Sequence, residues 1–205
     1  MNVITLYQPY ASLAIAGIKT WETRGNPPHG DMCPEGVRGL PGKRINAGDR
    51  ILIHAARTWA PGWLRWYSPE RSDADSDRLN VLESVGVDFH ECGDNWWKID
   101  TRSLPFGAIL GSVRIDRVLP IVFYDDGPPS GWPDDEAIID TSTDGGVRRV
   151  TLWPHGDSKG HEIDISDQVP FGNWEPGNWA WQLSDPQPLD QPIPVTGKQG
   201  VWEWK

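Results

Sequence analysis

The sequence predicts a mainly β protein with short helices, an α+β arrangement built around a small β-barrel. Short segments with continuous or alternating apolar residues recur along the 205 residues, which is typical of barrel strands. Stretches rich in Gly, Pro and acidic residues separate them and predict long loops. Because each half of such a chain would bury only a thin core, we expect one domain over 1–205, with insertions at about 25–48, 57–104 and 124–175.

The N-terminal part predicts a strand, a short helix and a second strand. Residues 2–6 read Asn-Val-Ile-Thr-Leu, an apolar strand pattern. Pro9 suits the first turn of a helix, and Gly17 can supply the left-handed residue that ends it. Residues 19–24, rich in Thr and Trp, predict the second strand.

Later segments predict the rest of the sheet. Residues 50–56 form a near-continuous apolar run and predict a central strand, and residues 108–118 alternate as a strand with one buried face does. Residues 147–153 and 161–165 predict a peripheral hairpin, and 178–183 with 200–204 predict the closing strands. Within the second insertion, a short helix is expected from the spacing of Leu79, Leu82 and Val85.

Charge limits the range of partners. The formal net charge at pH 7 is −10, whereas proteins that grip long nucleic acid rely on clustered Lys and Arg. Residues 1–65 nevertheless hold eight Lys or Arg and only four Asp or Glu. A small basic region in an acidic body favours recognition of one nucleotide over tracking along a strand.

Neither a membrane anchor nor a metal centre is expected. No apolar run approaches the ~18 residues of a membrane span, and the first residues lack a signal-peptide pattern, so we expect a cytoplasmic protein. Cys33 and Cys92 are expected to be free thiols. Their spacings from His29 and His90 match no common zinc site, so we predict no metal and no cofactor.

One pair of motifs resembles a known family. Gln8-Pro9-Tyr10, a short helix, and residues 17–24 (Gly-Ile-Lys-Thr-Trp-Glu-Thr-Arg) are similar to the motifs of the ASCH family, as is the Gly48-Asp49 turn into a strand. Later segments that fit the same family are residues 104–111, 179–183, 192–194 and 197–200. The resemblance covers about half of the chain. It implies a PUA-like fold and RNA or DNA binding, with some members acting as amidohydrolases on N4-acetylcytidine and others as ribonucleases.

The charged residues of the second motif are the candidate site. In a strand, Thr20, Glu22 and Arg24 share one face, while Lys19 lies at the turn before it. An ammonium, a carboxylate and a guanidinium around one concavity could bind a base edge, hold a phosphate or transfer a proton. The alternative is an ion-pair cluster with a structural role.

Roles for individual residues follow in part from the resemblance. The family's amidohydrolases resemble a design with a Lys, matched here by Lys19, and a Thr whose position is held by Glu22. A mechanism that survives this replacement uses Glu22 as the base that activates water and Lys19 as the cation that polarises the amide oxygen.

The remaining candidates would bind rather than react. Gln8 and Tyr10 flank Pro9, where an amide and a phenol ring could read and stack on a base, with helix-entry packing as the alternative. His54 could orient a carboxylate or be a structural histidine. Trp179 and Trp181 share a strand face, and at least one is expected in the core.

Three functions therefore stay open. The first is a binding protein that recognises a base, modified or not, in RNA, in other single-stranded nucleic acid or in a free nucleoside. The second is an amidohydrolase acting on N4-acetylcytidine-like nucleosides. The third is a ribonuclease, metal-independent or metal-assisted, which the acidic charge disfavours because long RNA would be repelled.

Overall fold

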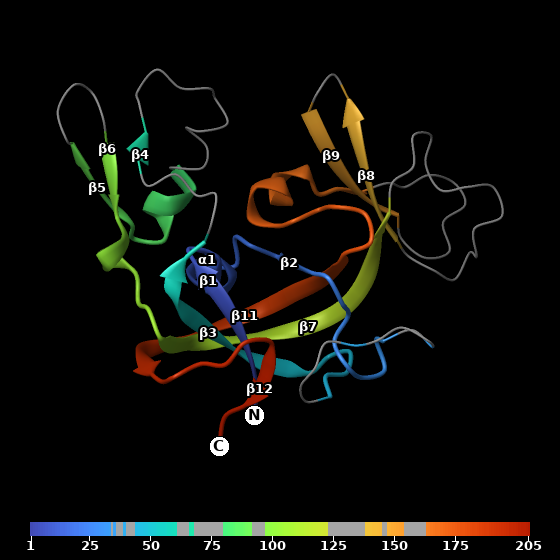
Figure 1. Ribbon diagram of the computed structural model, residues 1–205, viewed down its shortest axis with the longest axis horizontal. Helices are drawn as coiled ribbons and strands as arrows, with labels where there is room; N and C mark the ends of the chain where they lie inside the picture. Colours follow the sequence, from blue (N-terminus) through green and yellow to red (C-terminus); the bar gives the residue numbers. More distant parts are fainter. Residues whose placement is uncertain are drawn as a thin grey trace. The chain divides into compact units, whose positions relative to one another are not determined.

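The structure is a computed structural model of the whole chain. It describes residues 1–33, 35, 39, 44–60, 66–67, 80–91, 97–122, 138–144, 147–153 and 163–205. The chain divides into two compact units, one holding Met1–Lys19, Arg50–Val113 and Asp185–Lys205 and the other holding Thr20–Asp49 and Arg114–Ser184. Most of the regular structure is strand, and the helices are few and short, as predicted (Figure 1).

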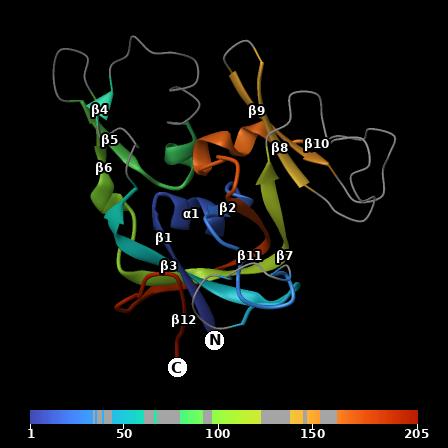
Figure 2. The ribbon, with the colours of Figure 1, turned by 45° about the vertical axis from the view of Figure 1, so that its right-hand side comes forward.

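Both chain ends belong to the main sheet of the first unit. β1 (Asn2–Gln8) pairs in parallel with β3 (Arg50–Trp59) and antiparallel with β12 (Val201–Glu203). The N-terminal ammonium donates to the carbonyl of Trp204 at 2.9 Å, so the two ends of the chain lie together beside β12 (Figure 2). Val3 of β1, Leu52 of β3 and Trp202 of β12 meet in one core cluster, which Ile109 also joins.

The predicted helix is confirmed as α1 (Tyr10–Ile15), which packs on β1 and β3. The Leu13 amide donates to the Pro9 carbonyl at 3.0 Å, and the peptide bond between Gln8 and Pro9 is cis. Gly17 has φ of +77°, the left-handed conformation that ends many helices. The amides of Ile18 and Lys19 then both donate to the Leu13 carbonyl, so the chain leaves the helix with Lys19 fixed at its end.

The second predicted insertion, residues 57–104, contains a three-stranded sheet that the sequence analysis did not predict. β4 (Trp66–Tyr67), β6 (Trp97–Asp100) and β5 (Asp88–Glu91) pair in that order, and η1 (Thr101–Ser103) follows β6. Residues 80–84 are helical and bury Leu82, as expected from its spacing. A separate apolar cluster joins this region to the end of β3, formed by Trp59, Leu82, Val87 and Leu104.

The second unit carries the other predicted strands. β2 (Trp21–Arg24) pairs antiparallel with the start of β11 (Trp179–Pro194). β7 (Ala108–Val122) begins in the first unit and ends in the second, where β8 (Ile138–Asp144) joins it in parallel. β9 (Val147–Trp153) and β10 (Ile163–Asp164) form the predicted hairpin, and η2 (Ser166–Phe171) follows. Their common core is formed by Trp21, Leu119, Ile121, Val150, Ile165, Trp174 and Ala180.

The prediction of a closed barrel is wrong, because the strands form an open sheet. β12 is an edge strand in the first unit and β10 is an edge strand in the second, and no pairing between described strands joins them. Closure needs a continuous hydrogen-bond ladder between the first and last strands. β12 has three residues and β10 has two, and such short edge strands are one way in which proteins end a sheet. The prediction of one domain over 1–205 stays a prediction.

Two further differences concern strand lengths. β8 lies inside the predicted third insertion, and β11 continues to Pro194 instead of stopping near residue 183. The described residues of the first insertion, 25–48, contain neither a helix nor an extended strand, as predicted. In the part of the chain that the structure describes, no helix is long and apolar enough to cross a membrane.

Candidate functional site

Gln8, at the end of β1, is fully buried and tightly held. Its side-chain amide donates to Ser12 Oγ at 2.9 Å and to the Pro105 carbonyl at 2.7 Å, and its oxygen accepts from the Ser12 amide at 3.2 Å. Both amide hydrogens are therefore used within the first unit. Pro9 is buried next to it. These contacts give Gln8 a structural role, and its role in reading a base stays a prediction.

Lys19 is the least expected buried residue of the first unit. Only 1% of its surface is exposed, and its ammonium lies 5.2 Å from the centroid of the Tyr10 ring. An ammonium within about 6 Å of an aromatic face is attracted by the ring quadrupole. The end of α1 thus holds a cation against a half-buried aromatic ring, a contact that the sequence analysis did not predict.

His54, in β3, is enclosed by the C-terminal segment. Nδ1 lies 3.2 Å from Thr5 Oγ1 and Nε2 lies 3.2 Å from the Val195 carbonyl, and the ring stands edge-on to Trp202 at 5.8 Å. Burial lowers the pKa of His54, with the positive charge of Arg57 adding to the effect and the hydrogen bond to Val195 opposing it. Within the first unit His54 therefore joins β1, β3 and the 195–202 segment, which is a structural role.

Glu22 and Arg24 form an ion pair on β2 in the second unit. Arg24 Nε lies 2.7 Å from Glu22 Oε1, and only 8% of Glu22 is exposed. Their parity in the strand puts both on one face, as predicted. The guanidinium fixes one carboxylate oxygen of a nearly buried acid, which orients the carboxylate.

The start of β2 is fixed from two sides. The Thr20 amide donates to Gln168 Oε1 at 2.8 Å, and its carbonyl accepts from the Leu183 amide at 2.8 Å. On the other face of the strand, Thr23 Oγ1 accepts from the Asn173 amide at 2.7 Å. Gln168 is itself buried. Positioning of β2 thus depends on η2, a contribution that the sequence alone does not reveal.

Trp181 was not predicted as a site residue but lies beside the ion pair. The register of β2 and β11 puts Trp181 opposite Glu22 and Trp179 opposite Arg24, and side chains directly opposite in an antiparallel pair share a face. Trp181 is fully buried, which confirms that at least one of the two indoles is enclosed. The alternation in residues 179–181 predicts that Trp179 and Trp181 share a face of β11. Only the register of β2 against β11 shows that Glu22 lies opposite Trp181.

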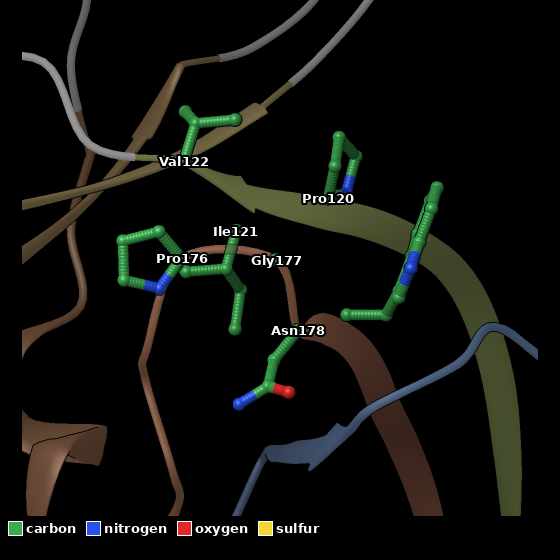
Figure 3. Close-up of a pocket in the computed structure, with 7 residues that line it drawn as sticks. Pro120, Ile121, Val122, Pro176, Gly177 and Asn178 are labelled. Carbon is green, nitrogen blue, oxygen red and sulfur yellow. The ribbon is translucent and has the colours of Figure 1, made fainter.

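A shallow groove of about 420 Å³ lies elsewhere in the second unit. Pro120, Ile121 and Val122 of β7 line one side, and residues 176–179 line the other (Figure 3). The Ile121 amide donates to the Asn178 carbonyl at 2.8 Å, which joins the two sides. Figure 3 shows the Asn178 amide pointing away from Val122. The lining is mainly apolar and includes none of the predicted site residues.

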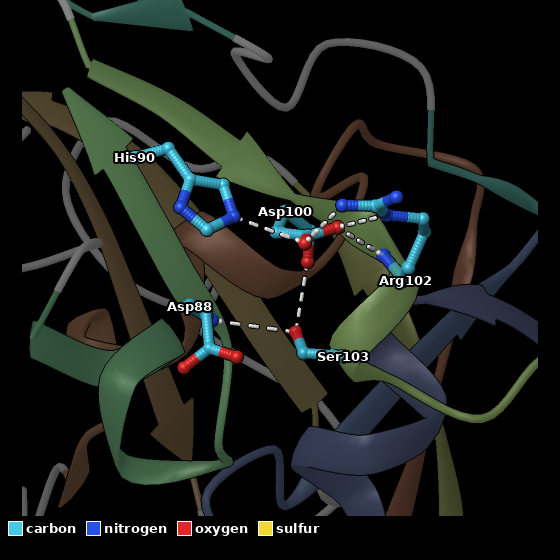
Figure 4. A network of polar contacts seen from close by, with 5 residues as sticks. All are labelled: Asp88, His90, Asp100, Arg102 and Ser103. Carbon is cyan, nitrogen blue, oxygen red and sulfur yellow. Dashed lines mark hydrogen bonds and ion pairs between the residues drawn. The ribbon is translucent and has the colours of Figure 1, made fainter. Parts of the chain in front are cut away.

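A second polar cluster lies at the end of β6. Asp100 accepts from Arg102 Nη2 at 2.9 Å and lies 3.0 Å from His90 Nε2, while its backbone carbonyl accepts from Ser103 Oγ (Figure 4). Hydrogen bonds from Arg102 and then His90 hold the pKa of Asp100 well below its usual range. The Asp100 side chain also accepts from the Arg102 amide at 2.9 Å and so caps η1. These hydrogen bonds hold the turn from β6 into η1, which is a structural role.

The described residues contain no group of three or more His, Cys, Asp or Glu that could hold a metal ion. Cys33 and His29 lie in the described part of the first insertion, whereas Cys92 lies outside the described residues. In comparisons with known proteins, neither a family model nor a curated protein matches the chain.

Proposed function

We propose that this chain is an ASCH-type, PUA-like protein that binds a nucleobase, in a free nucleoside or in single-stranded RNA. The observation that carries the proposal is the burial of Lys19, which is 1% exposed with its ammonium 5.2 Å from the Tyr10 ring. Lysines are almost never fully buried without a specific reason, because burial disfavours the charged form. An open sheet in place of a closed barrel is the main departure from what the resemblance implied.

The chemistry of this pair suits a base. An aromatic face stacks on any base, and an ammonium next to it can donate to a ring nitrogen or an exocyclic oxygen. Stacking and a few hydrogen bonds are sufficient to bind one nucleotide. The net charge of −10 supports the same scale of ligand, because a long phosphate backbone would be repelled.

The test is a calorimetric titration of the purified protein with cytidine, uridine, adenosine, guanosine, N4-acetylcytidine and a short single-stranded RNA. Lys19→Met keeps the length of the side chain and removes the charge, so it should weaken binding about 10- to 100-fold. Lys198→Met changes an exposed lysine of the same unit and is the matched control. Absence of binding to every one of these ligands would overturn the proposal.

A second candidate function is hydrolysis of an N4-acyl nucleoside, and Glu22 favours it. Its carboxylate is 8% exposed and is oriented by Arg24 at 2.7 Å, which suits a general base. In this reaction Glu22 takes a proton from water as the hydroxide adds to the amide carbonyl, and it then gives that proton to the leaving nitrogen as the carbon–nitrogen bond breaks. N4-acetylcytidine and water thus give cytidine and acetic acid, which ionises to acetate and a proton.

Chromatography of the reaction mixture distinguishes the two functions. Glu22→Gln keeps the shape of the side chain and removes the base, so it should abolish turnover while nucleoside binding persists. A protein that binds N4-acetylcytidine and never releases cytidine would be a binding protein. An active Glu22→Gln variant would exclude Glu22 as the base.

A further inference from the structure

The indole N–H of Trp181 is a buried donor that has no acceptor among the described residues. Trp181 has 0% of its surface exposed, and no atom of the described residues accepts a hydrogen bond from Nε1. Most buried polar groups in native proteins are hydrogen-bonded, so an exception requires an explanation. Trp174 in the same unit is equally buried, yet its Nε1 donates to the Gln168 carbonyl at 3.0 Å. The part of the chain that the structure describes therefore supplies an acceptor for Trp174 and none for Trp181.

The position of Trp181 in the sheet indicates where an acceptor for its indole N–H could come from. It lies opposite Glu22 in the register, on the same face of the β2–β11 ribbon. The neighbouring residues Trp21 and Ala180 point to the other face, where they belong to the apolar core. Trp181 thus lies on the face that carries the Glu22 and Arg24 ion pair, where a fixed carboxylate accepts hydrogen bonds and an indole N–H can only donate.

We propose that Trp181 Nε1 donates a hydrogen bond to the ligand and that Glu22 accepts one from the ligand's neighbouring atom. The ligand class is a planar heterocycle with a donor and an acceptor side by side on one edge, as on the Watson–Crick edge of a nucleobase. This inference rests on the proposed nucleobase-binding function, and within the second unit it makes Trp181 a specificity-determining residue. The indole nitrogen is covered, so binding includes a shift of the side chains over it and is slower than docking to an open surface.

The experiment records the indole N–H resonances of ¹⁵N-labelled protein during titration with the tightest-binding nucleoside. The Trp181 resonance, assigned through bonds, is expected to move downfield as its proton enters a hydrogen bond. The Trp174 resonance is the matched reference, because its acceptor is already provided. Trp59 is a second reference, since its buried Nε1 also lacks an acceptor among the described residues but lies in an apolar cluster.

Affinity gives a second readout. Trp181→Phe keeps an aromatic ring and removes the donor, so affinity should fall about tenfold. Trp174→Phe should leave it unchanged. The nucleoside methylated at the ring nitrogen of its Watson–Crick edge should bind the parent protein more weakly and lose little further affinity in Trp181→Phe.

The outcomes separate the inference from the proposed function. A nucleoside that binds without moving the Trp181 resonance overturns the inference and leaves the proposed function standing. Absence of any nucleoside binding overturns both. The resonance shift is measured on the parent protein, so it decides the question even where Trp181→Phe fails to fold.

Discussion

Gly197→Ala should destabilise the first unit by closing the space next to His54. A Cβ on residue 197 would lie 2.1 Å from His54 Cε1 and 2.4 Å from Nδ1, closer than non-bonded atoms approach. The ring cannot turn away without losing its contacts to Thr5 and Val195. Overpacking costs about 1–3 kcal/mol, and losing even one of the two hydrogen bonds adds about 1, so we expect a loss of at least about 2–4 kcal/mol.

Urea unfolding followed by circular dichroism measures this loss. With an m-value of about 2 kcal/mol/M, the midpoint should fall by about 1–2 M. Gly25→Ala is the matched control, because its nearest neighbour is the side chain of Asn178 at 3.9 Å, an ordinary contact. In the double variant with His54→Ala the ring is absent, so the added methyl should cost little and the two changes should be strongly non-additive. A Gly197→Ala protein within about 0.5 kcal/mol of the parent would refute the argument.

Three other predictions concern single polar groups. Because burial lowers the pKa of His54, the unfolded chain takes up a proton below about pH 6.5 that the folded form resists. The free energy of unfolding should therefore fall between about pH 7.5 and 5.5, and less so in His54→Gln, as urea titrations at both pH values would reveal. Asp100→Asn should speed hydrogen exchange at the Arg102 amide, because the charged cap of η1 is weakened. Gln8→Leu should lower the free energy of unfolding in urea by about 2–3 kcal/mol, since it removes three hydrogen bonds and leaves the half-buried Ser12 and Pro105 groups without them, whereas Gln187→Leu, at an exposed position, should have no measurable effect.

Strands with a strong local pattern could be predicted from the sequence, and those decided by distant contacts could not. The runs that became β1, β3 and β7 are apolar enough to be buried wherever they pair. The alternating pattern predicts only residues 178–183 of β11 as strand, and the rest contains Pro186, Pro188, Pro192 and Pro194, which disfavour a strand interior. In the structure this half of β11 is largely exposed, a setting in which strands tolerate proline.

Some features of the candidate site could likewise be predicted from the sequence, and others depend on distant contacts. The motif identified Lys19 and Glu22, and both are buried, which ordinary surface charges are not. The same motif gave no warning that the amide of Gln8 is engaged by Pro105, because a residue 97 positions away supplies that acceptor. Whether a polar side chain is satisfied within the protein depends on its tertiary neighbours. Sequence patterns that rank residues by type therefore cannot separate a structural amide from a binding one.

The partner of Trp181 on the neighbouring strand could not be predicted from strand parity alone. Alternation fixes which residues of a strand share a face, but it does not fix which residues of the neighbouring strand lie opposite. Here the Leu183 amide of β11 donates to the Thr20 carbonyl at 2.8 Å and fixes the register of β2 against β11. A slip of one residue would turn Glu22 toward the apolar core and put Trp21 in its place. Burying that carboxylate among apolar side chains would be costly, so the contrast of polar and apolar faces excludes a slip by one residue. A slip by two residues would keep the faces, so the pairing of Glu22 with Trp181 depends on the bond between Thr20 and Leu183.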